Sequence, residues 1–382
     1  MNVTRVFRRV LRVRRTRWRL ASRRTLWAVV AALFLTSSLA LAVHDPPEQR
    51  RSQPPAPAEE GLAAQALQDL TADGVIPAPP ANTLPRTDRS RSPDTKGAAP
   101  EDGPAPPRRS APLGTAVGTA AYRGMGTWVD VYDWSATFTK GRPHVSPDAV
   151  DGMAEQGVQT LYIQASKHDA PSDVLEADLL RDWIDRSRRK GIRVVAWYLP
   201  TLVDPARDLE RMKAIAALPV DGVAVDIESK DVAQLEERNR RLVEFSAELR
   251  KALPGRSIGG IVLPPVVLEA VNSAYWPSFP YRQLVPYYDV WMTMGYWTNR
   301  ISGTTYRDAN RYTTENVKRL RANLGLPNAL VHPIGGIGDR TTVVDVAGYR
   351  TAVNDTDSIG GSLYDWRTTK PELWESLRAF RR

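Results

Sequence analysis

Two carboxylates lie close together in the stretch VDGVAVDIES, residues 220–229: Asp226 and Glu228. Neighbouring carboxylates on one face cannot both ionise cheaply, so one of them tends to keep its proton at neutral pH. A carboxyl group that is protonated at neutral pH can act as a general acid. The pair therefore predicts acid/base chemistry, with Glu228 protonating a leaving group and Asp226 sharing its proton or orienting a substrate. The structural alternative is a hydrogen-bonded polar cap at the end of a strand.

Side-chain alternation predicts that both acids lie on one face of that strand. One face carries bulky β-branched residues: Val223, Val225 and Ile227. The other face carries two small residues followed by the two acids: Gly222, Ala224, Asp226 and Glu228. A strand that merely ends in a polar loop would not need its acids on alternate positions.

The elements that position this pair recur along residues 121–382. Eight apolar, β-branched runs are expected to form strands, beginning at Gly124, Val158, Arg193, Val220, Ser257, Asp289, Leu330 and Ile359. Amphipathic segments separate most of them, most clearly residues 232–253. This pattern and length predict an α/β fold, a single (β/α)8 TIM barrel. A doubly wound open sheet is the alternative, disfavoured because no glycine-rich phosphate turn follows the first strand.

In a TIM barrel the catalytic groups lie at the C-terminal ends of the strands. The face with small residues must then be the lumen, and the bulky face must pack against the outer helices. Asp226 and Glu228 are therefore expected at the mouth of the barrel.

The stretch DGVAVDIE resembles the fourth-strand motif D-G-x-D-x-D-x-E of family-18 glycoside hydrolases, the chitinases and endo-N-acetylglucosaminidases. Asp221, Gly222, Asp226 and Glu228 match the motif, and Ala224 does not. The resemblance implies that Glu228 is the general acid/base. It also implies that Asp226 orients the N-acetyl group of the substrate, which acts as the nucleophile. In that family an inner carboxylate shares a proton with the middle aspartate. This chain has Ala224 at that position, so the resemblance leaves open whether the protein is active.

Two further stretches share in the resemblance. MTMGYW, residues 292–297, is similar to the family's sixth-strand M-x-Y-D, with Trp297 in place of the aspartate. GGSLYDW, residues 360–366, is similar to the last strand, which supplies an aromatic floor under the sugar. The resemblance implies that Trp366 is this floor, with Tyr364 as the second choice.

Aromatic residues in or just after the predicted strands independently favour a sugar ligand, because flat rings offer apolar area to the C–H faces of pyranoses. They are Trp128, Trp134, Trp197, Tyr198, Trp276, Trp291, Tyr296, Trp297 and Trp366. We expect four of them to bind substrate: Trp197, Tyr296, Trp297 and Trp366.

The first predicted strand ends in WVDVYDWS, which is expected to bring Asp130 and Asp133 to the same face of the barrel as further substrate-binding candidates. If the enzyme is a conventional two-carboxylate hydrolase, one of them is the partner of Glu228. That arrangement loosely resembles family-25 lysozymes, which also have a strand-one aspartate and a D-x-E on a later strand.

The N-terminal residues predict export. Residues 1–24 carry ten arginines and no acid. The next nineteen residues, 25–43, contain no charged side chain. About 20 apolar residues cross a bilayer as a helix, and arginines on one side keep that side in the cytoplasm. We expect a basic cytoplasmic segment followed by a transmembrane anchor. Cleavage after Ala42 as a secretory signal is the alternative, and it also places the remainder outside the cytoplasm.

Residues 44–120 are predicted to be a disordered linker, because fifteen of the thirty prolines lie between Pro46 and Pro112. The net charge of +9 also has a local origin, since the ten N-terminal arginines leave 42 basic against 43 acidic residues. Nucleic acid is therefore not an expected partner.

The chain has no cysteine and four histidines, so neither a metal nor another cofactor is expected. We predict a monomeric, exported, membrane-tethered glycoside hydrolase that acts on a polysaccharide containing N-acetylhexosamine. The alternative is a carbohydrate-binding barrel of the cell envelope with impaired catalysis.

Overall fold

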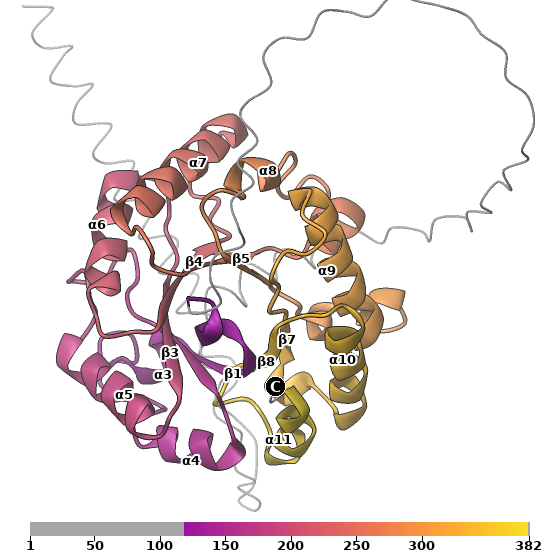
Figure 1. The fold of residues 1–382 in the computed structure, drawn as a ribbon, viewed down its shortest axis with the longest axis horizontal. Coiled ribbons are helices and arrows are strands. Elements are labelled where there is room, and N and C mark those ends of the chain that lie inside the picture. The colour runs from indigo at the N-terminus through magenta and orange to yellow at the C-terminus, as the bar shows by residue number, and fades with distance from the viewer. Residues whose placement is uncertain (1–117, 381–382) are drawn as a thin grey trace, which may run out of the picture. The chain divides into compact units, whose positions relative to one another are not determined.

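The computed structural model describes residues 118–380, and within them eight strands form a parallel β-barrel (Figure 1). The strands are β1 (Gly124–Val129), β2 (Thr160–Gln164), β3 (Arg193–Tyr198), β4 (Gly222–Ile227), β5 (Ile258–Val262), β6 (Val290–Thr293), β7 (Ile334–Ile337) and β8 (Gly360–Tyr364). They pair in the order β6-β5-β4-β3-β2-β1-β8-β7. Two isolated parallel bridges, Trp291 with Val331 and Met294 with Ile334, link the two ends and nearly close the ring. The predicted TIM barrel is confirmed.

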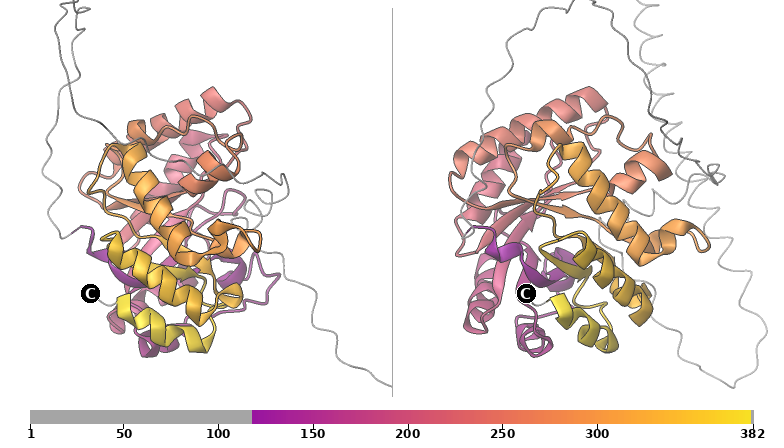
Figure 2. Two further views of the ribbon diagram at one scale, coloured as in Figure 1. Left: turned by 90° about the vertical axis from the view of Figure 1, so that its right-hand side faces the viewer. Right: turned by 45° about the vertical axis from the view of Figure 1, so that its right-hand side comes forward.

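Helices lie around the outside of the barrel and cover its outer face (Figure 2). They are α3 (Val131–Trp134), α4 (Ala149–Gln156), α5 (Ala177–Arg189), α6 (Pro205–Ala216), α7 (Leu235–Ala252), α8 (Tyr281–Leu284), α9 (Ala309–Leu324), α10 (Val343–Asp355) and α11 (Pro371–Leu377). Short 3-10 or π-helical turns are η1 (Ala120–Tyr122), η2 (Val267–Val271), η3 (Trp297–Asn299), η4 (Thr305–Arg307), η5 (Gly338–Arg340) and η6 (Arg378–Phe380). The helix predicted over residues 232–253 corresponds to α7.

Tyr122, from η1, fills the lumen near the N-terminal ends of β4 and β5. Its hydroxyl lies 2.7 Å from the carbonyl oxygen of Val223 and 3.0 Å from that of Ser257. A Cβ atom at Gly222 would lie 2.7 Å from the same hydroxyl, so only glycine leaves room for the ring. The small lumen residues of β4 therefore accommodate Tyr122.

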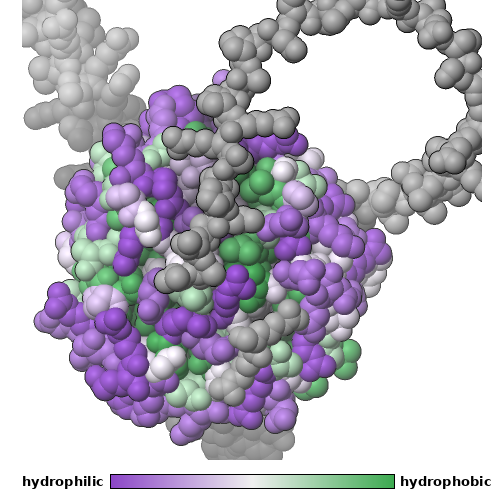
Figure 3. All heavy atoms as spheres, viewed as in Figure 1, coloured by the Kyte–Doolittle hydropathy of each residue, from purple (hydrophilic) through white to green (hydrophobic). Residues whose placement is uncertain are grey.

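Figure 3 shows hydrophilic outer residues around hydrophobic residues nearer the centre on the face of the molecule seen in Figure 1.

The first strand is shorter than its apolar run predicted. The run GMGTWVDVY is a strand only as far as Val129, and the chain then turns into α3. Asp130 begins this helix because its side chain accepts a hydrogen bond from the backbone N–H of Tyr132 at 2.8 Å. Asp130 and Asp133 therefore leave the barrel wall on a helical turn.

The predictions for residues 1–24 and 25–43 lie outside the described residues, as does the linker prediction apart from residues 118–120. Among residues 118–380, no helix is both long enough and apolar enough to span a bilayer. Within the described residues the elements of the barrel run from η1 to η6.

Candidate active site

The Asp226/Glu228 pair lies at the C-terminal end of β4, where alternation placed it. Asp226 is inside the strand, Glu228 follows it directly, and each is only 3% exposed. Asp226 Oδ1 and both carboxylate oxygens of Glu228 make no hydrogen bond to any residue of the described range. These buried acceptors differ from most buried polar atoms, which have a partner. Their lack of protein partners is what a site that binds a polar substrate requires.

Burial controls the protonation of this pair. It raises the pKa of Glu228 to about 7. Burial, together with the charge of Glu228, raises the pKa of Asp226 well above its ordinary value. Both acids therefore hold a proton to higher pH than an ordinary carboxyl group, and Glu228 can both give and accept a proton near neutral pH. This matches the sequence expectation that the two acids do not ionise together.

Tyr296, just beyond β6, lies near both this pair and a second group of acids. Its pKa is raised well above the usual value by burial and by the charges of Glu228 and Asp226, followed by those of Asp365 and Asp130. Its ring centroid is 5.7 Å from that of Tyr364. The structure thus brings the predicted residue Tyr296 to the carboxylates.

The second group, the β1/β8 cluster, consists of Asp130, Asp133 and Asp365. One carboxylate oxygen from each lies within 4.8 Å of the others. All three residues are buried, and the cluster lies where β1 and β8 end. Asp365 was missed by the sequence reasoning, although its position directly after β8 is the signal that could have identified it.

Hydrogen bonds hold the β1/β8 cluster in place. The Tyr364 hydroxyl donates to Asp130 at 2.6 Å, and Arg367 Nε donates to Asp133 at 2.5 Å. Burial first, and then the charge of Asp365, raises the pKa of Asp130 to about 6 and that of Asp133 to about 9. Within residues 118–380 this geometry could hold a cation, but Arg367 already supplies a positive charge to it.

Aromatic rings line the lumen beside the carboxylates. Trp128 stacks on Tyr162 with centroids 4.4 Å apart, and its ring lies 6.0 Å from Trp197 and 6.3 Å from Tyr364. Trp197 is the register partner of Ala224, so the two side chains lie on the same face of adjacent strands. The predicted residue Trp197 therefore reaches the lumen, next to the position where the family-18 motif has a carboxylate.

No protein-family model matches the chain, and no curated protein matches it. Solved structures do. The spore cortex-lytic enzyme SleL of Bacillus cereus superposes with a TM-score of 0.52 at 9% identity, covering 68% of this chain and 74% of its own. SleL of Bacillus megaterium gives 0.51 at 6% identity, with the same coverage. A family-18 chitinase of Cycas revoluta, solved with allosamidin, gives 0.50 at 12% identity, covering 67% of this chain and 99% of its own.

The chain has the barrel fold of family-18 chitinases. At these identities the similarity establishes the fold alone. Within this fold the first motif residue, Asp221, lies at the N-terminal end of β4, where its side chain accepts a hydrogen bond from the Val194 backbone N–H at 2.8 Å. Asp221 therefore links two strands at the end of the barrel opposite Glu228.

Two predicted sugar-binding residues are not brought to the Asp226/Glu228 pair. Trp297 packs against Tyr349 of α10 at 5.2 Å and under Gly336 of β7. Trp366 lies 5.1 Å from Trp374 of α11. Both expectations came from the family resemblance and the aromatic cluster, and both residues follow the end of a strand, since β6 ends at Thr293 and β8 at Tyr364. Tyr364, the second choice for the aromatic floor, is the residue that faces Trp128 and Tyr296.

Proposed function

We propose that this protein is a glycoside hydrolase that cleaves a polysaccharide containing N-acetylhexosamine. The observation that carries the proposal is the buried Asp226/Glu228 pair at the end of β4, with unpartnered oxygens and raised pKa values. The chitinase fold and the aromatic lumen support the same substrate class.

In the proposed reaction Glu228 protonates the glycosidic oxygen of the leaving sugar. The carbonyl oxygen of the substrate's own N-acetyl group attacks the anomeric carbon as that bond breaks. Asp226 orients the acetamido group by accepting a hydrogen bond from its N–H. Glu228, now ionised, then takes a proton from the water that opens the cyclic intermediate, which returns the enzyme to its starting state.

Asp226 performs this role without the inner carboxylate of the family motif. Ala224 offers no group to exchange a proton with, and burial and the charge of Glu228 favour the protonated form of Asp226. A neutral Asp226 stabilises the positive charge of the intermediate less than an ionised one would. The proposal therefore includes a slower reaction than the complete motif would support.

A two-carboxylate route with Asp130 is the second candidate mechanism. It is favoured by one observation: the charges of Glu228, Asp226 and Asp130 all raise the pKa of Tyr296, so all three acids lie near that side chain. In that route Asp130 would be the base or nucleophile opposite Glu228. An oligomer without N-acetyl groups separates the mechanisms, because only the two-carboxylate route could cleave it.

The carbohydrate-binding alternative is favoured by Ala224 and by the outward position of Trp297, where the family motif has an aspartate. It requires that N-acetylhexosamine oligomers bind without being cleaved. Binding and turnover measured on one preparation distinguish it from the hydrolase.

The proposed enzyme is monomeric and works outside the cytoplasm. Residues 25–43 would anchor it, or serve as a cleaved signal, and the proline-rich residues 44–120 would carry the barrel away from the membrane. Susceptibility of the barrel to protease added to intact cells, with the N-terminal residues retained in the membrane fraction, tests the anchored form.

The decisive experiment compares the full-length protein with Glu228→Gln on chitin oligomers and on peptidoglycan. Loss of the proton donor should lower kcat/KM by about 100-fold or more. Glu236→Gln on the exposed face of α7 is the matched control and should leave kcat/KM unchanged. Equal activity of the parent and Glu228→Gln would remove Glu228 from the mechanism.

A further inference from the structure

A cavity of about 540 Å³ lies between α4 and α11 on the outside of the barrel. Figure 1 shows these two helices as neighbours beside the paired strands β1 and β8. It is separate from the lumen that contains Glu228. Its volume falls within the range of about 300–1,000 Å³ that is typical of small-molecule sites. Trp366, which the family resemblance placed under the substrate, lines this cavity.

The cavity has an aromatic wall. Trp366 is half-buried, and the buried ring of Trp374 supports it at 5.1 Å and 43°. Gly152 of α4 faces the edge of Trp366, and a Cβ atom there would come within 3.3 Å of the ring. Glycine thus leaves space beside a supported indole. A fixed, partly exposed indole is a suitable surface for the C–H face of a pyranose.

Polar and basic groups surround that wall. His144, Ser146 and Gln156 line the cavity and can hydrogen-bond sugar hydroxyls. Among the lining residues the ionisable ones are Arg367 and His144, and no carboxylate is present. Arg367 donates through Nε to Asp133, and its side chain is still 41% exposed. The lining is therefore complementary to a ligand that carries a negative charge.

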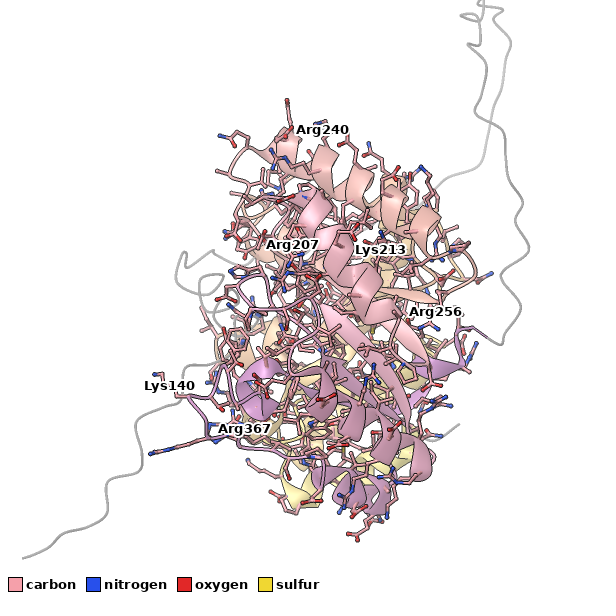
Figure 4. The ribbon with its side chains drawn as sticks, turned by 90° about the vertical axis from the view of Figure 1, so that its left-hand side faces the viewer. Lys140, Arg207, Lys213, Arg240, Arg256 and Arg367 are labelled. Carbon is pink, nitrogen blue, oxygen red and sulfur yellow. The ribbon has the colours of Figure 1, made fainter. Side chains whose placement is uncertain are left out.

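Arg367 also connects this cavity to the mouth of the barrel. Its partner Asp133 belongs to the β1/β8 cluster, so one side chain contacts both places. Figure 4 shows Arg367 and Lys140 at the same end of the barrel, whereas Arg256 lies toward the other end. A polymer that leaves the mouth on the β1/β8 side would pass this cavity.

We propose that the α4/α11 cavity is a second carbohydrate-binding site, which holds one sugar ring of an acidic glycan outside the catalytic lumen. The ring lies against Trp366, and its carboxylate faces Arg367. This inference goes beyond the proposed hydrolase activity and concerns binding alone, so it is tested without turnover.

The test measures binding by isothermal titration with the full-length protein carrying Glu228→Gln, which prevents consumption of the ligand. The probes are a hexasaccharide of alternating glucuronate and N-acetylglucosamine and a neutral N-acetylglucosamine hexamer of the same length. We expect the acidic probe to bind more tightly and to weaken with added salt. Trp366→Ala should weaken its binding roughly tenfold, as expected for loss of an aromatic contact.

A second variant keeps the test independent of folding defects. Ser146→Trp adds a bulky side chain at an exposed lining position, leaves Trp366 and the core intact, and should weaken binding to a similar degree. Unchanged affinity in both variants, or equal affinity of the parent for the two probes, overturns the proposal. Hydrolysis by the protein with Glu228 intact is scored separately, so failure of this site and failure of the hydrolase are distinguishable.

Discussion

Two groups of buried acids lie at the same end of this barrel, and they differ in how the protein satisfies them. The Asp226/Glu228 pair has three carboxyl oxygens without a partner in the described residues. In the β1/β8 cluster only Asp133 Oδ2 lacks a partner among the described residues, and the cluster is held by the hydroxyl of Tyr364, a backbone N–H and Arg367. Burying a polar group without a partner costs free energy, so a protein retains such a group chiefly where a ligand will satisfy it. The contrast supports the proposal that β4 supplies the acid/base pair and that the cluster has a supporting, positioning role.

The largest expected effect is on turnover. Asp226→Asn should lower kcat/KM on N-acetylhexosamine oligomers by about 100-fold, because the group that orients the nucleophile is altered. Asp130→Asn should lower it less than about tenfold, since Asp130 only helps to position Tyr364. Steady-state kinetics on both variants measure the difference. A loss of kcat/KM in Asp130→Asn as large as that in Asp226→Asn would contradict this assignment of roles and favour the two-carboxylate mechanism.

A second effect is on stability and its pH dependence. The pKa of Glu228 is raised in the folded state to about 7, so the protein loses stability as pH rises from the unfolded value of about 4.5 through 7. Glu228→Gln removes this loss and should be more stable than the parent at pH 8 by on the order of 3 kcal/mol.

The measurement is urea unfolding of parent and Glu228→Gln at pH 4 and pH 8. The advantage of the variant should be present at pH 8 and nearly absent at pH 4, where Glu228 is protonated in both states. A variant that is less stable at pH 8 would mean that Glu228 has a stabilising partner in the protein.

The smallest effect concerns the β1/β8 cluster. Arg367→Met removes the guanidinium that donates a hydrogen bond to Asp133, whose carboxyl already keeps a proton at neutral pH because its pKa is raised to about 9. We expect a loss of about 1–2 kcal/mol at neutral pH, seen as a lower melting temperature. Lys140→Met is the control, because Lys140 lies at the same end of the barrel and forms no ion pair with the cluster within residues 118–380. No change in Arg367→Met would show that Arg367 does not support the cluster.

Alternation within strands could be read from the sequence, and the two acids Asp226 and Glu228 lie where the pattern placed them. Gly222, Ala224 and Asp226 share the lumen face because a strand has a period of two residues. Trp297, Trp366 and Asp365 could not be placed in this way. Each follows the end of a strand, where the chain turns and the period no longer applies, and Asp130 begins a helix that the apolar run did not reveal.

Composition and periodicity alone were sufficient for the eight strands, the barrel class and the position of Glu228 at the mouth, because these follow from local side-chain pattern. Only the tertiary structure decided which acids are left without partners, since Tyr364 and Arg367 are more than 200 residues from the aspartates they bind. It also decided that Trp366 faces an outer cavity between α4 and α11. Contacts between residues distant in the chain set pKa values and binding surfaces, and no local pattern encodes them.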